Sequence, residues 1–86
     1  MDAPIYSTPQ AATVAVKRAL RENNVTTKTV RTSRTADDRM LSCIFMPQGT
    51  SDATYSKMAA VLTSAGYHVR LHVETSWVAA SCDATR

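Results

Sequence analysis

The stretch TKTVRTSRTADDRMLSCIFM, residues 27–46, decides the fold, because it joins two β-type runs through a turn. The first run, residues 25–34, is rich in Val and Thr, whose branched side chains favour extended backbone. The turn formers TADD follow at residues 35–38, and residues 39–46 are apolar at nearly every position. This pattern predicts a β-hairpin.

The two strands of this hairpin are expected to occupy different places in the sheet. Apolar side chains fall on both faces of the second strand: Leu41, Cys43 and Phe45 on one, and Met40, Ile44 and Met46 on the other. Such a pattern is typical of a central strand, or of one whose outer face is also covered. The first strand is polar at most positions and therefore fits the edge of a sheet.

Two helices flank the hairpin in the sequence. Residues 7–24 combine capping residues, an early proline, an apolar stripe and a final pair of asparagines, which together predict a helix. A second helix is expected to begin at residue 50 or 51, where Thr or Ser can cap it, and to end at Gly66. Its apolar stripe consists of Tyr55, Met58, Ala59, Leu62 and Ala65.

Residues 67–78 alternate between apolar and polar side chains and predict one half-buried strand. The apolar face comprises Tyr67, Val69, Leu71, Val73 and Trp77, and the polar face comprises His68, Arg70, His72, Glu74 and Ser76. The order is then α-β-β-α-β, an α+β fold with two helices packed on one face of a three-stranded sheet. The third strand could lie parallel beside the second, through a right-handed crossover, or antiparallel beside the first.

The 86 residues suffice for a single domain over residues 1–86, with residues 1–6 and 79–86 expected to be flexible ends. No transmembrane run and no secretory signal is visible, so we expect a cytoplasmic protein without membrane contact. Cys43 and Cys82 form no CxxC pair, and whether they form a disulfide stays open, although a cytosolic location argues against it.

Catalytic and cofactor motifs are missing from the sequence. It has no nucleophile in a specifying context and no Gly-rich phosphate loop, and we expect no enzyme activity and no cofactor. His68 and His72 would lie roughly 13 Å apart on a strand, too far to bind one metal ion together.

The formal net charge is only +3, but the basic residues are concentrated in the first part of the chain. The candidate contact residues are Lys28, Arg31 and Arg34 on the first strand and Lys17, Arg18 and Arg21 on the first helix. If these surfaces adjoin, they form a patch for phosphates or an acidic protein surface. A solvated edge strand, whose charges prevent edge-to-edge pairing, would also explain the strand's bases.

Base stacking by aromatic rings would favour single-stranded nucleic acid as the ligand of this patch. However, Phe45, Tyr55, Tyr67 and Trp77 all fall on positions expected to be in the core. Tyr6 is then the one ring expected to be free, so the pattern predicts no stacking surface.

The helix AATVAVKRALRENN and the segment KTVRTSRTADDRMLSCIF resemble small domains encoded by phages and plasmids, among them some large polyvalent protein-associated domains. Those domains have a VKxALK-type helix followed by an SVRTSRYSGG-like hairpin, and VRTSR at residues 30–34 matches that pattern. The glycine-containing turn is replaced here by TADD. The resemblance covers about the first half of the chain and implies a mobile-element origin.

Two functions are therefore expected. The first is a non-catalytic accessory protein of a phage or mobile element that binds and inhibits a host protein complex, as anti-CRISPR proteins do. The second is a module that binds nucleic acid without sequence preference through the basic strand and helix. Homodimerisation through the edge strand is also left open.

Overall fold

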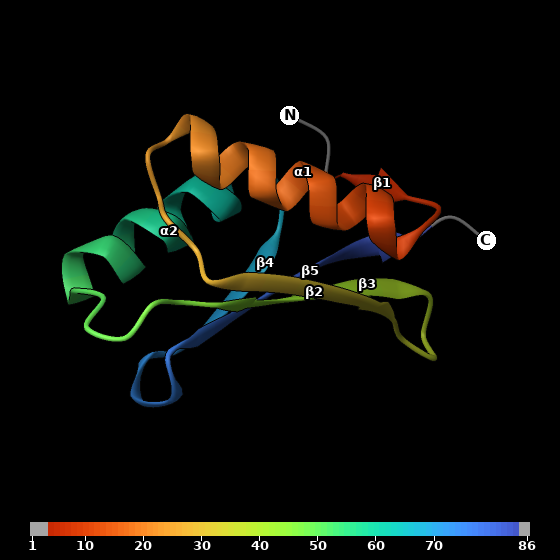
Figure 1. Ribbon diagram of the computed structural model, residues 1–86. Coiled ribbons are helices and arrows are strands. Elements are labelled where there is room, and N and C mark those ends of the chain that lie inside the picture. The colour runs from red at the N-terminus through yellow and green to blue at the C-terminus, as the bar shows by residue number, and fades with distance from the viewer. Residues whose placement is uncertain (1–3, 85–86) are drawn as a thin grey trace.

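The computed structural model describes residues 4–84, in which two helices pack on one face of a five-stranded mixed sheet (Figure 1). The predicted α+β class and the two helices are confirmed, but the sheet has five strands instead of three. The elements are β1 (Ile5–Tyr6), α1 (Pro9–Glu22), β2 (Thr29–Arg34), β3 (Arg39–Phe45), α2 (Asp52–Ser64), β4 (His68–His72), a 3-10 turn (Val73–Thr75) and β5 (Trp77–Ala84).

β5 lies inside the sheet and pairs along both of its edges. One edge pairs with β3, which in turn pairs with β2 at the outer edge of the hairpin. The other edge pairs with β4 over residues 77–81 and with the short β1 at residues 83–84. The hairpin, the edge position of β2 and the central position of β3 are as predicted.

The expectation that residues 79–86 form a flexible tail is wrong for residues 79–84, which belong to β5. Every second side chain of this strand is buried: Val78, Ala80 and Cys82. Because these side chains are small and stand among Ser and Asp, the hydrophobic period of a strand is weak there. Residues 5 and 6, also expected to be flexible, form β1, while residues 1–3 and 85–86 lie outside the described part of the chain.

Neither expected neighbour of the third strand is correct. β3 and β4 both run antiparallel to β5, so they are parallel to each other but are separated by β5. The connection through α2 is therefore the expected parallel crossover, with another strand between the two that it joins.

The strand expected over residues 67–78 is interrupted by the 3-10 turn. Ser76 closes this turn in the left-handed region, at φ 58° and ψ 40°, and its N–H donates to the carbonyl oxygen of Val73. The turn reverses the chain and breaks the alternation of faces. Trp77 consequently lies on the same face as His72, its antiparallel partner, and not on the face of Val69 as predicted.

Both helices begin at the expected capping residues. The Thr8 Oγ1 accepts a hydrogen bond from the Ala11 N–H at 3.2 Å, and the Ser51 Oγ accepts one from the Thr54 N–H at the same distance. Asn23 follows the last turn of α1, and Asn24 takes a positive φ of 60°. Each helix start and the end of α1 therefore follow from local side-chain chemistry.

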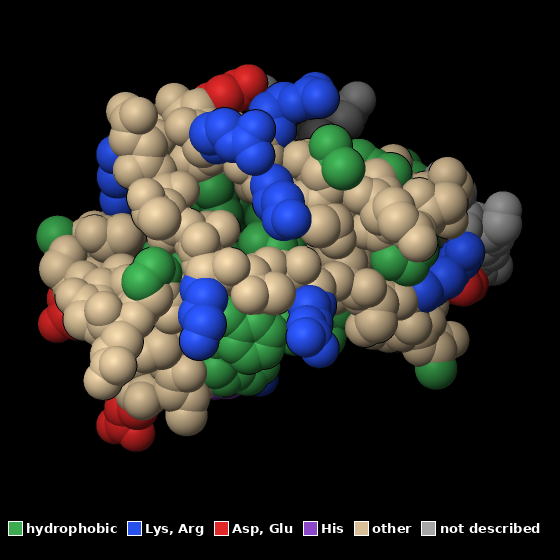
Figure 2. Space-filling model, in the orientation of Figure 1, with side chains coloured by type: hydrophobic (Ala, Val, Ile, Leu, Met, Phe, Trp, Pro, Cys, Tyr) green, Lys and Arg blue, Asp and Glu red, His purple; other side chains and the backbone are tan. Residues whose placement is uncertain are grey.

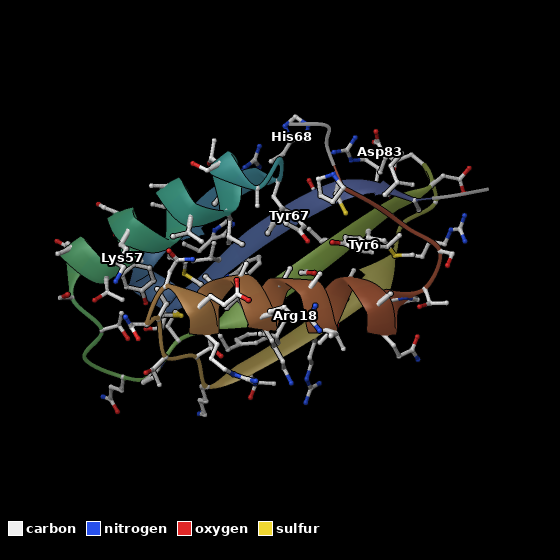
Figure 3. The ribbon with its side chains drawn as sticks, turned by 90° about the horizontal axis from the view of Figure 1, so that it is seen from above. Tyr6, Arg18, Lys57, Tyr67, His68 and Asp83 are labelled. Atoms are coloured by element: carbon white, nitrogen blue, oxygen red, sulfur yellow. The ribbon has the colours of Figure 1, made fainter. Side chains whose placement is uncertain are left out.

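The core lies between the helices and the sheet. Its fully buried side chains include Val16 and Leu20 of α1, Met58 and Leu62 of α2, and Ile44 of β3. Figure 3 shows Tyr6 and Tyr67 side by side at the border of this core, where the Tyr67 hydroxyl donates to the Tyr6 hydroxyl at 3.4 Å. Burial is the main cause that raises the pKa of Tyr67. No helix within residues 4–84 has the length and apolar character needed to cross a membrane.

Candidate functional site

Within residues 4–84, no element covers the face of the sheet that is turned away from both helices (Figure 1). In β3 the side chains of Met40, Ser42 and Ile44 are buried toward the helices, so Leu41, Cys43 and Phe45 point to the opposite face. We call this second surface the open face. The strand register orders its side chains into rows that cross the sheet.

The first row on the open face contains three aromatic side chains. Phe45 of β3 is paired with Trp77 of β5, and Trp77 is paired with His72 of β4. The Phe45 and Trp77 ring centroids are 6.4 Å apart, and the Trp77 and His72 rings stack with centroids 4.0 Å apart and an interplanar angle of 4°. We call Phe45, Trp77 and His72 the ring row.

The second row places one arginine at each edge of the sheet. From β2 to β4 it consists of Arg31, Cys43, Ala79 and Arg70. Both arginines are exposed, and the two residues between them are small. The third row, Ser33, Leu41, Ser81 and His68, continues this polar surface.

Two depressions mark the open face beside the ring row. The smaller one lies at the β2 edge and is lined by Lys28, Thr29, Arg31 and Phe45, a residue that is 37% exposed. The larger one extends over β5 and β4. Its lining residues are Leu41, His68, Val69, Arg70, His72, Trp77, Ala79 and Ser81.

The charge of the three rows is positive. None of the residues in the three rows is acidic. Beyond the third row, Asp83 accepts a hydrogen bond from the Arg39 guanidinium at 3.0 Å, so this acid and this base largely neutralise each other. Arg31 and Arg70 therefore make the second row positive, whereas Glu74 shares a hollow with His72 at the 3-10 turn.

The six basic residues predicted as contact residues do not all lie in one patch. Lys17, Arg21 and Lys28 line a cleft between the end of α1 and the start of β2, and Arg31 lies on the open face. Arg18 projects from the side of α1 turned away from the sheet (Figure 3). Arg34 stands at the other end of β2, with its guanidinium 3.5 Å from Asp38.

Figure 2 shows the division of the basic side chains on one side of the molecule. One group lies over α1, and a second group stands at the lower edge on both sides of a hydrophobic patch. In this view the two groups lie one above the other, with a band of other side chains between them.

Sequence reasoning found Arg31 of the open face but missed its aromatic rings and Arg70 as contact residues. The expectation that Phe45 and Trp77 lie in the core is wrong, because Phe45 is exposed and Trp77 is only partly buried on the open face. Tyr6, expected to be free, is half-buried instead. The signal that could have placed Trp77 is the polar tripeptide before it, Glu74-Thr75-Ser76, which forms and closes the 3-10 turn.

The two cysteines lie on opposite faces of the sheet, since Cys43 belongs to the second row of the open face and Cys82 is buried toward the helices. Their thiols are free, and their placement prevents a disulfide within one molecule. Among residues 4–84, no three His, Cys, Asp or Glu side chains gather as a metal ion would require.

Comparison of the chain with protein-family models, with curated proteins and with solved structures found no match.

Proposed function

We propose that the open face binds single-stranded nucleic acid. Its nucleobases would stack against the ring row, and its phosphates would be held by the basic side chains on either side. The observation that carries this proposal is the position of Phe45, Trp77 and His72 on the uncovered face, with Arg31 and Arg70 in the adjacent row. Aromatic side chains on the exposed face of a four-stranded sheet stack bases in one common class of RNA-binding module.

The ring row is a short stack of aromatic rings that a nucleobase could extend. Trp77 stacks closely on His72, with centroids 4.0 Å apart, whereas the Phe45 ring lies further from it, at 6.4 Å. Phe45 is different, because its ring borders the depression between Lys28 and Arg31. A base that enters this depression would stack on Phe45, an interaction worth roughly 1 to 3 kcal/mol.

The arginines on either side fit the phosphates of such a strand. Arg31 stands on β2 and Arg70 on β4, with β3 and β5 between them. Three strand spacings make this separation about 14 Å. A single-stranded nucleic acid that crosses the sheet would therefore meet one exposed guanidinium at each edge. Guanidinium groups bind phosphate oxygens in bidentate geometry.

A duplex would use this surface poorly. Its bases are already stacked and paired, and only unpaired bases can be splayed out onto aromatic side chains. The rings of the ring row belong to a sheet surface, with no helix or loop among them that could enter a groove. We therefore expect single strands to bind more tightly than duplexes of the same sequence.

A protein partner is the alternative occupant of the same face. An acidic protein surface would also meet Arg31 and Arg70, and binding to a host protein complex, as expected of an anti-CRISPR-like inhibitor, stays a prediction. The chemistry favours nucleic acid because it explains the rings and the arginines together: bases are flat and aromatic, and their backbone is anionic.

The test is a fluorescence polarisation titration of labelled single-stranded DNA and RNA with the wild-type protein and two variants. Phe45→Ala removes the exposed ring and should weaken binding roughly tenfold or more. Val14→Ala removes an exposed apolar side chain from α1, on the helix side, and should leave affinity unchanged. Equal affinity of Phe45→Ala and wild type, or no binding of either strand at low salt, would refute the proposal and leave the protein partner.

A further inference from the structure

The cleft between α1 and β2 has the chemistry of a second contact for the same strand. We infer that a bound strand leaves the ring row at Phe45, passes over the β2 edge and places its phosphates in this cleft. This inference rests on the proposed function and extends it, because it gives the strand a path across two surfaces of the molecule.

The lining of the α1–β2 cleft suits phosphate groups. Its charged members are Lys17, Arg21 and Lys28, and none of the described residues that line it is acidic. Thr26, Thr27 and Thr29 add three hydroxyl groups that can donate hydrogen bonds to phosphate oxygens. The rest of the lining is Val25 and Val30, both buried, which give the cleft an apolar floor.

The helix and the turn that follows it bring these basic side chains together. Lys17 and Arg21 are four residues apart on α1, so they lie on the same side of the helix. The chain then turns at Asn24, which has a positive φ of 60°, and returns along the cleft to β2. The Lys28 N–H donates to the carbonyl oxygen of Phe45 at 2.8 Å, which fixes this return beside the ring row.

The cleft and the depression at Phe45 are continuous. Lys28 and Thr29 line both, so they form the border between the two hollows. A strand that stacks a base on Phe45 therefore has its next phosphates beside Lys28, with Lys17 and Arg21 further along the same path. In Figure 2 the basic side chains beside the lower hydrophobic patch and those over α1 face the same side of the molecule.

The path predicts that affinity depends on the length of the strand. An oligonucleotide of about 4 nucleotides should occupy the ring row alone, whereas one of about 12 should also reach the cleft. Each phosphate neutralised on a single strand contributes roughly 0.7 to the slope of log affinity against log salt. Two further contacts should therefore steepen that slope by about 1.4 for the longer strand.

The experiment measures affinity and salt slope for both lengths with the wild-type protein and the double variant Lys17→Gln, Arg21→Gln. The variant should bind the short strand as the wild type does, but should bind the long strand about tenfold more weakly at low salt, with the slope reduced by about 1.4. Arg18→Gln is the matched control, since this side chain points away from both surfaces. It should change the affinity for neither oligonucleotide.

The outcomes separate this inference from the proposed function. If the wild type binds both lengths and the double variant binds the long strand unchanged, the cleft is not part of the path, and the ring row stands. If the wild type binds neither length, both proposals fail. The variant could instead lose as much affinity for the short oligonucleotide as for the long one, with its thermal unfolding unchanged. In that case Lys17 and Arg21 contribute to binding at the ring row itself, and the separate path is wrong.

Discussion

At the scale of single residues, Ile44 and Phe45 show how far local sequence determines a side chain's role. They are neighbours in β3, both large and apolar, yet Ile44 is fully buried and Phe45 is 37% exposed on the open face. Alternation predicts that they point in opposite directions. It does not predict which direction is covered, because that depends on helices that pack from elsewhere in the chain.

The two cysteines carry a residue-scale prediction, because they differ in burial. Burial raises the pKa of the Cys82 thiol, whereas an unfolded cysteine ionises near pH 8.5. The folded protein should therefore keep this thiol protonated as pH rises through that value, and its free energy of unfolding should fall there. At pH 8 to 9, a thiolate-specific reagent should modify Cys43 fast and Cys82 only on the time scale of unfolding.

Mass spectrometry of the modified protein measures both rates. The Cys43→Ala variant should lack the fast reaction, and denaturant should make the thiols react alike. Saturating single-stranded DNA should also slow the reaction of Cys43, which lies beside the ring row on the open face. Fast modification of Cys82 in the folded protein would contradict its placement in the core.

At the scale of elements, the hairpin and both helices could be predicted because their signals are local. Caps, turn residues and an apolar stripe all lie within the segments that they define. β5 could not be predicted in this way. Its small side chains carry little hydrophobic period, and its place is set by strands on both of its edges, of which β1 and β3 come from distant parts of the chain.

The position of β5 is tested by placing the same large polar side chain on each of its faces. Ala80 is fully buried and Ala79 lies on the open face. Ala80→Gln should lower the free energy of unfolding by about 3 kcal/mol, because it overpacks the core and buries an amide without partners. Ala79→Gln should change it by less than about 1 kcal/mol.

Denaturant unfolding of the two variants and of the wild type gives these values. A flexible tail over residues 79–86 would make both substitutions neutral. Equal and small effects at Ala80 and Ala79 would therefore contradict the placement of β5 inside the sheet.

At the scale of the whole molecule, the residues that stabilise the fold lie on a different face of the sheet from those proposed to bind the ligand. The helices and one side of the sheet supply the core, which leaves the open face free to carry exposed rings and unpaired charge. The basic residues Lys28 and Arg31 could be found from the sequence by their charge, but their neighbourhood with Phe45 could not. That neighbourhood depends on the hairpin register, and the ring row further depends on β5.

Trp77 offers the most direct test of the central claim, because it is the only tryptophan in the sequence and belongs to the ring row. Its fluorescence is measured while single-stranded oligonucleotides, and then the matching duplex, are added at low and at moderate salt. We predict saturable quenching by the single strands, weaker binding at higher salt, and a much smaller response to the duplex. Trp77 emission that stays unchanged at saturating concentrations of single-stranded DNA and RNA would contradict the assignment of the open face to nucleic acid.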